Sequence, residues 1–175
     1  MMYRKNKLYY KNESGFTLIE MLVSLAITGL IGLGTTVSIA QLSNETATNN
    51  DFITAGRNVM NAIYWISQDA QAAQTVSGVT GFPQTDALSL AWVDWDNSSH
   101  NATYSLENGQ LKRSYNVDGQ IAVTQIAEYI NPSSNMTSCV SSNGTLTLKI
   151  TSSVGEGSRI ADVTRIREIS CRPKL

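Results

Sequence analysis

The chain is poor in the residues that build metal sites and nucleophile relays. Its 175 residues include two cysteines, Cys139 and Cys171, and a single histidine, His100. Two cysteines and one histidine lack the spacing of a tetrahedral zinc site. The sequence also lacks a glycine-rich phosphate loop and a zinc-protease motif. We therefore predict no cofactor and no enzyme activity, which leaves a structural or binding role.

Charge is missing from residues 21–44, which are mostly apolar. As a helix rising ~1.5 Å per residue, this stretch would reach about 36 Å, enough to cross a hydrocarbon core ~30 Å thick. Residues 1–15 ahead of it carry an excess of positive charge, from Arg4, Lys5, Lys7 and Lys11 against Glu13. That excess predicts that the N-terminal end stays cytoplasmic and that the chain beyond residue 44 is exported.

One acidic residue, Glu20, stands at the start of the apolar stretch, five residues after Gly15. A carboxylate in hydrocarbon is costly, so Glu20 needs a partner. The order Gly15-Phe16-Thr17-Leu18-Ile19-Glu20 behind a basic leader resembles the type III signal of type IV pilins and type II secretion pseudopilins.

That resemblance implies a processing pathway. In this family a membrane prepilin peptidase cuts after the glycine and N-methylates the new first residue, using a methyl donor. Carried over, the cut falls between Gly15 and Phe16, and Phe16 becomes the methylated N-terminus. Glu20 would then pair with the N-terminal amine of a neighbouring pilin or pseudopilin subunit.

Two simpler explanations of the N-terminal stretch are a secretory signal peptide and a plain single-span anchor. A signal peptide has an apolar region of about 7–15 residues that ends at small residues, whereas this run is longer and has no Ala-x-Ala site. A plain anchor explains residues 21–44 but explains neither Glu20 nor the order of the motif. Proline is also absent before Pro83, although major pilins usually place one near the position of Val37.

The chain divides into a leader at 1–15, a transmembrane and assembly helix at 16–44, an amphipathic second half of the helix at 45–76, and a head at 77–175. Apolar side chains recur at helical spacing along the second half, which predicts one face packed on the chain's own sheet. They are Phe52, Val59, Ile63, Ile66, Ala70 and Ala73. Polar residues, Asp69 among them, are expected on the other side.

Period-two alternation begins near residue 87 and predicts strands around 88–92, 102–106, 111–115, 121–124 and 145–151. Tight hairpin turns are predicted at Asn108-Gly109 and Asp118-Gly119, and Asn143-Gly144 precedes the strand at 145–151. The last segment, 158–172, has apolar residues three apart, but its β-branched composition favours a strand with room for a bulge. The fold class predicted is α+β, with a long N-terminal helix packed on an antiparallel β-sheet.

A weaker resemblance covers residues 104–130. The pattern Tyr104-x-Leu106-x-x-Gly109-x-Leu111-x-Arg113, and a second one at 124–130, is similar to J-type minor pseudopilins and W-type minor pilins. These are mostly strand and turn residue types, so a major pilin or another minor one stays open as an alternative.

Two groups of residues in the head are candidates for binding. Asp94, Asp96 and Asn97 begin like a calcium loop, because hard cations favour carboxylate and amide oxygens, but the later glycine and glutamate of an EF-hand are missing. His100 follows in the same polar stretch and is expected to be solvated. The tryptophans are expected in the core or on a sheet face, with an exposed aromatic patch as the alternative: Trp65, Trp92 and Trp95.

The predicted export of the head would place Cys139 and Cys171 outside the cytoplasm. An oxidising compartment would permit a Cys139–Cys171 disulfide. The alternative is two unrelated buried thiols.

These observations predict a single-pass inner-membrane prepilin with an extracytoplasmic C-terminal domain, which becomes a minor subunit of a pilus-like or type II secretion filament. Two alternatives are a membrane-anchored binding module that does not polymerise, and a DNA-uptake minor pilin. The latter needs a basic patch, for which Arg159 to Lys174 is the candidate run. Without the leader the chain has 9 basic and 13 acidic residues, a net charge of −4, so nucleic acid is not an expected partner.

Overall fold

The structure is a computed structural model that describes residues 15–157 and 159–173; the leader residues 1–14 lie outside this part. The contacts divide the chain into two compact units, Met1–Asn44 and Glu45–Leu175. One long helix, α1 (Leu18–Ala72), contributes its first half to the first unit and its second half to the other. The α+β class predicted from the sequence is therefore confirmed.

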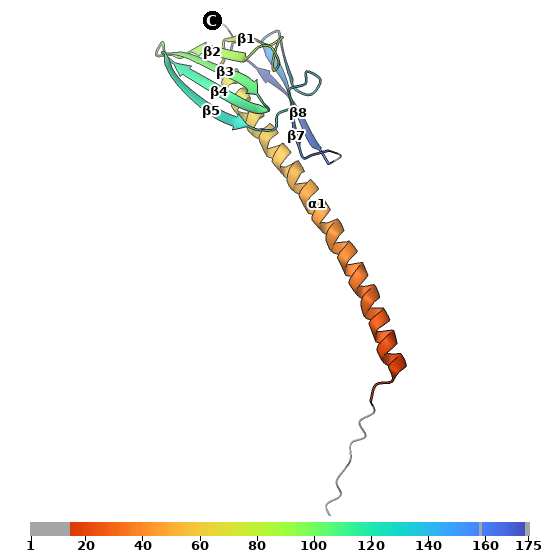
Figure 1. Ribbon diagram of the computed structural model, residues 1–175. Coiled ribbons are helices and arrows are strands. Elements are labelled where there is room, and N and C mark those ends of the chain that lie inside the picture. Colours follow the sequence, from red (N-terminus) through yellow and green to blue (C-terminus); the bar gives the residue numbers. More distant parts are fainter. Residues whose placement is uncertain (1–14, 158, 174–175) are drawn as a thin grey trace, which may run out of the picture. The chain divides into compact units, whose positions relative to one another are not determined.

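The strands of the second unit form two antiparallel sheets, one more than the sequence predicted (Figure 1). The five-stranded sheet has the order β1-β2-β3-β4-β5, and the three-stranded sheet has the order β6-β7-β8. Their bounds are β1 Thr75–Ser77, β2 Leu88–Val93, β3 Ser99–Glu107, β4 Gln110–Val117, β5 Gln120–Ala127, β6 Ser138–Ser142, β7 Thr145–Val154 and β8 Ala161–Ser170. The ambiguous last segment is thus a strand, as predicted.

The two predicted hairpin turns are confirmed, and Asn143-Gly144 forms a third turn of the same kind. Asn108 and Gly109 have φ values of 50° and 76°, and the Asp118-Gly119 and Asn143-Gly144 pairs are also positive at both positions. Two central residues with positive φ match the backbone twist of the flanking strands, which is why Asn-Gly and Asp-Gly are favoured there. These local turns set the β3–β4, β4–β5 and β6–β7 pairings.

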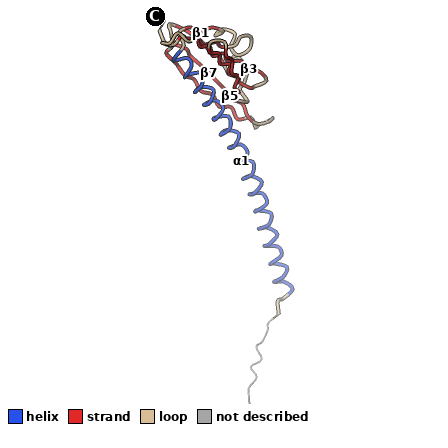
Figure 2. Tube along the Cα trace, turned by 90° about the vertical axis from the view of Figure 1, so that its left-hand side faces the viewer, coloured by secondary structure: helices blue, strands red, loops and turns tan. Residues whose placement is uncertain are grey.

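The core lies between the second half of α1 and both sheets, and the strands surround the last turns of the helix in Figure 2. Five of the six residues predicted for the packed helix face are buried: Val59, Ile63, Ile66, Ala70 and Ala73. Phe52 was predicted with them, but 47% of it is exposed. The first buried residue of the helix is Ala55, so Phe52 precedes the part of α1 that the sheets cover.

The helix ends at Ala72, four residues before the predicted boundary at residue 76. Thr75, Val76 and Ser77 form β1 instead and pair with β2. Gly78 follows with φ +74°, and a Cβ there would lie 1.9 Å from the carbonyl oxygen of Ala87. The strand pairing available to β-branched residues overrides the helical pattern here.

A buried ion pair ties α1 to the five-stranded sheet. Asp69, predicted on the polar side of the helix, is only 5% exposed. Its carboxylate accepts hydrogen bonds from Nε (2.7 Å) and Nη2 (2.8 Å) of Arg113 on β4. The hydroxyl of Tyr104 on β3 also donates to Asp69. Burial, with the nearby Asp69 charge, raises the pKa of Tyr104 well above its usual range, so Tyr104 stays a neutral donor.

We expect Asp69→Ala to cost about 3–5 kcal/mol of unfolding free energy, because it leaves the Arg113 guanidinium buried without its counter-charge. The matched control is Lys112→Ala, which lies on β4 beside Arg113 and breaks a more exposed pair with Glu107 of β3. Water screens that pair, so the loss should be much smaller. Denaturant unfolding followed by circular dichroism measures both, and equal losses would contradict the role given to Asp69.

Candidate functional site

The start of α1 is closed by a reciprocal pair of hydrogen bonds between Thr17 and Glu20. The backbone N–H and the hydroxyl of Thr17 donate to Oε2 of Glu20, at 2.9 and 2.8 Å. In return, the backbone N–H of Glu20 lies 3.4 Å from Oγ1 of Thr17. This is a capping box, which satisfies amide groups that a helix N-terminus otherwise leaves unpaired. The acid predicted to need a partner therefore has one within its own chain.

Gly15 and Phe16 precede the helix and have open surroundings among the described residues. Phe16 is 82% exposed. A Cβ added at Gly15 would meet no atom within 4 Å. Among the described residues, nothing therefore crowds a side chain at position 15.

The helix beyond Glu20 is suited to hydrocarbon. It is long and apolar enough to cross a membrane, and its apolar side chains from Leu18 to Leu42 are exposed. Hydroxyl groups in this stretch bond back to carbonyl oxygens of the preceding turn: Ser24 to Glu20, Thr28 to Ser24, Thr36 to Gly32 and Ser38 to Gly34, at 2.7–2.9 Å. Satisfied hydroxyls remove much of the cost of polar groups where water is absent.

A comparison with family models matches residues 10–36 to the prokaryotic N-terminal methylation motif. No curated protein and no solved structure matches the chain. The match covers Gly15 and Phe16, the capping box and the first part of the apolar helix. It supports a type IV pilin-like prepilin that is processed by a prepilin peptidase and anchored by a single span.

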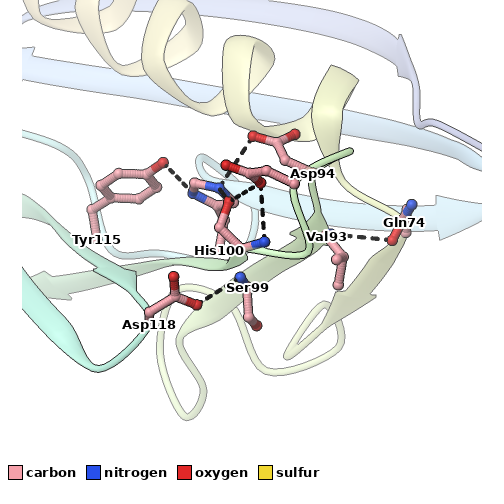
Figure 3. A network of polar contacts seen from close by, with 9 residues as sticks. Gln74, Val93, Asp94, Ser99, His100, Tyr115 and Asp118 are labelled. Carbon is pink, nitrogen blue, oxygen red and sulfur yellow. Dashed lines mark hydrogen bonds and ion pairs between the residues drawn. The ribbon is translucent and has the colours of Figure 1, made fainter.

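The head contains a polar and aromatic cluster at one end of the five-stranded sheet (Figure 3). His100 Nε2 lies 3.1 Å from Oδ2 of Asp94, and its Nδ1 lies 2.7 Å from the hydroxyl of Tyr115. The ring stacks on Trp92 with 5.2 Å between centroids. The prediction of a solvated loop histidine is wrong, since His100 belongs to β3 and its side chain is 12% exposed. Extending the alternation of Tyr104 and Ala102 by two residues would have found it.

Ser98, His100 and Asp94 do not have the geometry of a serine–histidine–acid relay. Ser98 Oγ lies 2.9 Å from Nε2 of His100, the same nitrogen that faces Asp94. A serine–histidine–acid relay needs the hydroxyl and the acid on opposite nitrogens of the ring. The contacts instead join the β2–β3 turn to β4 through Tyr115.

The residues proposed for calcium are engaged with protein donors. Asp94 faces His100, and Oδ1 of Asp96 accepts hydrogen bonds from the N–H (3.0 Å) and the hydroxyl (2.6 Å) of Ser98. Asn97 occupies the turn with φ 67°. The described part of the chain contains no group of three or more His, Cys, Asp or Glu able to hold a metal ion. The structure thus adds no support to the calcium alternative.

The tryptophans and the basic run are less uniform than predicted. Trp92 is in the core and Trp65 is packed against it, but Trp95, in the β2–β3 turn, is 95% exposed. Arg165 and Arg167 lie two residues apart on β8, and Arg167 borders a groove beside α1, whereas Arg159 lies 3.7 Å from Asp51 and Arg172 borders another groove. The described part of the candidate basic run is therefore divided among separate places; Lys174 lies outside it.

The two cysteines are free thiols in the structure, so the disulfide is not confirmed. Cys139 on β6 stands opposite Leu148 of β7, whereas Cys171 follows β8, the strand on the other side of β7. The backbone N–H of Cys171 donates to the carbonyl of Gly144. Burial, with a smaller contribution from Cys171, raises the pKa of Cys139 to about 12.

In reduced protein at pH 8 we expect iodoacetamide to alkylate Cys171 well before Cys139, because a buried thiol with a raised pKa supplies almost no thiolate. Mass spectrometry of tryptic peptides over time measures the order, and faster labelling of Cys139 would contradict the burial. The same labelling after unfolding without reductant tests the disulfide. Two free thiols in protein taken from its native envelope would rule that disulfide out.

Proposed function

We propose that the chain is a prepilin that matures into a structural subunit of a type IV pilus-like or type II secretion filament. The observation that carries this proposal is the methylation motif, with Glu20 capped by Thr17 at the start of a helix that carries no charge from residue 21 to residue 44. In this proposal the head lies outside the cytoplasm and the helix crosses the inner membrane once.

Processing would occur at the exposed boundary before the helix. The peptidase cuts between Gly15 and Phe16 and methylates the new amine of Phe16. The open space around Gly15 supports this, because the fold gives no reason of its own for a glycine there.

Assembly would exchange the partner of Glu20. Among the described residues, the carboxylate accepts its hydrogen bonds from Thr17. In a filament interior of low dielectric, the Phe16 ammonium of a neighbour is a stronger partner, because charge-assisted hydrogen bonds exceed neutral ones. The pairing would set the axial register of one subunit against the next. Cβ atoms at Gly29, Gly32 and Gly34 would meet nothing within 4 Å, so a neighbouring helix can approach closely there.

We also propose a minor-subunit role, which rests on the sequence resemblance at residues 104–130 to J-type pseudopilins and W-type pilins. Two residues of that pattern, Tyr104 and Arg113, have a structural explanation because both bind Asp69. A membrane-anchored module that does not polymerise remains the competing proposal, and the experiments below separate the two. The divided basic run does not favour DNA uptake.

For processing, we expect Gly15→Leu to accumulate as uncleaved precursor, because a bulky side chain would block the peptidase. Gly15→Ala is the matched control and should be cleaved, since a single methyl group is a far smaller obstacle to the peptidase than a leucine side chain. Intact-mass measurement of protein from membranes reads the result. An unchanged mature mass in the Gly15→Leu protein would sink this assignment of the cut.

For assembly, we expect Glu20→Ala and Glu20→Gln both to lower incorporation into filaments. Glutamine retains the capping box with Thr17 but removes the charge, so it separates helix capping from pairing with an ammonium. The head contacts neither group in this proposal, so its thermal midpoint should stay unchanged in both variants.

Counting the protein in sheared filaments against wild type measures the effect. Normal incorporation of Glu20→Gln would show that the carboxylate serves only as a cap. Absence of the wild-type chain from every filament fraction would favour the anchored module that does not polymerise.

A further inference from the structure

The two sheets of the head have four edge strands in the described part of the chain, and three of them are protected against pairing with another strand. An edge strand presents unpaired N–H and C=O groups, which proteins protect with short length or with charge. β1 has three residues and β6 has five. β8 has ten residues, but it carries four charged side chains: Asp162, Arg165, Arg167 and Glu168.

The fourth edge strand, β5, has neither protection. Its eight residues, Gln120–Ala127, include no charged residue and no proline. Residues 120–125 are all exposed, and Ile121 and Val123 are 66% and 67% exposed. Within the described residues β5 pairs only with β4. An uncharged, β-branched edge of this length favours the addition of another strand.

The side chains beside this edge give it an apolar margin. Ile121 stands opposite Asn116 on β4, and Val123 stands opposite Ser114. The next strand continues those rows with Asn101 and Thr103, so the two apolar side chains have only polar neighbours across the sheet. Ile121 and Val123 therefore have no apolar side chain beside them on β4 or β3. An added strand would supply one.

We propose that β5 pairs with β5 of a second copy of this chain, antiparallel and centred on Ala122. Side chains of one face must meet the same face of the partner strand, which restricts the register. Centring on Ala122 places Ile121 opposite the partner's Val123 on both sides of the two-fold axis. A neutral strand also meets its own copy without like charges facing each other. The pairing joins the two five-stranded sheets into one.

This pairing goes beyond the proposed filament, because it needs only two heads held near one another. Chains anchored in one membrane meet at a raised effective concentration. The pair is isologous, so it closes on itself and does not by itself extend into a fibre.

The first test measures self-association of the full mature chain in detergent by sedimentation. Val123→Lys should weaken dimerisation about tenfold, because it removes both Ile–Val pairs and charges the edge. The matched control, Val140→Lys, charges a similarly exposed valine (59%) on edge strand β6 and should leave dimerisation unchanged. Circular dichroism of both variants confirms that each is folded.

The second test reads the register. Mixing Val123→Lys chains with Ile121→Glu chains should restore dimers, because lysine then faces glutamate across the pair. Ala122→Cys should form an intermolecular disulfide at the axis, whereas Thr103→Cys, in the middle of the sheet, should not. Wild type carrying only Cys139 and Cys171 gives the background for both.

A wild-type chain that stays monomeric at all concentrations would overturn the proposal. So would equal weakening by Val123→Lys and Val140→Lys, which would place the contact elsewhere. Linkage of Ala122→Cys to a different protein of the membrane, and not to a second copy, would also overturn it.

Discussion

The structure depends on one helix that must satisfy two different surroundings along an uninterrupted backbone. From Leu18 to Leu42 the exposed apolar side chains of α1 suit hydrocarbon, and from Ala55 onward its buried residues form the core of the head. A membrane span needs apolar residues all round, whereas a core helix needs a single apolar face. The sequence changes between these two patterns without proline, glycine turn or cap, so the helix continues through both.

Polar groups within that helix follow the same division. In the first half, hydroxyls bond to the helix's own carbonyls, and Glu20 bonds to Thr17. In the second half, Asp69 reaches outward to Arg113 and Tyr104 on different strands. Polar groups in the first half of α1 therefore bond to residues of the same helix. In the second half, the sheet supplies hydrogen-bond partners that are distant in sequence. The first arrangement is readable from sequence spacing, and the second is not.

That difference explains how much could be predicted. The helix, the turns at Asn108-Gly109 and Asp118-Gly119, and the strand at 161–170 depend on local pattern, and all are confirmed. Asp69, Phe52 and His100 were misplaced because their surroundings depend on chain far away in sequence. Their burial is set by where the sheets begin to cover α1 and by the aromatic rings beside His100. The capping box could have been predicted from the sequence, since Thr17-x-x-Glu20 is its ordinary signature.

The capping box also changes the energetic argument for Glu20. An unpartnered carboxylate in the membrane would pair with any available cation and would not select a particular one. A carboxylate that already accepts two hydrogen bonds from Thr17 has a tolerable resting state, so only a better donor displaces it. A neighbour's ammonium is such a donor where the dielectric is low, and much less so where water screens it. In the proposed filament, the same side chain would thus be stable in a separate subunit and selective during assembly, because the change in surroundings decides which partner it prefers.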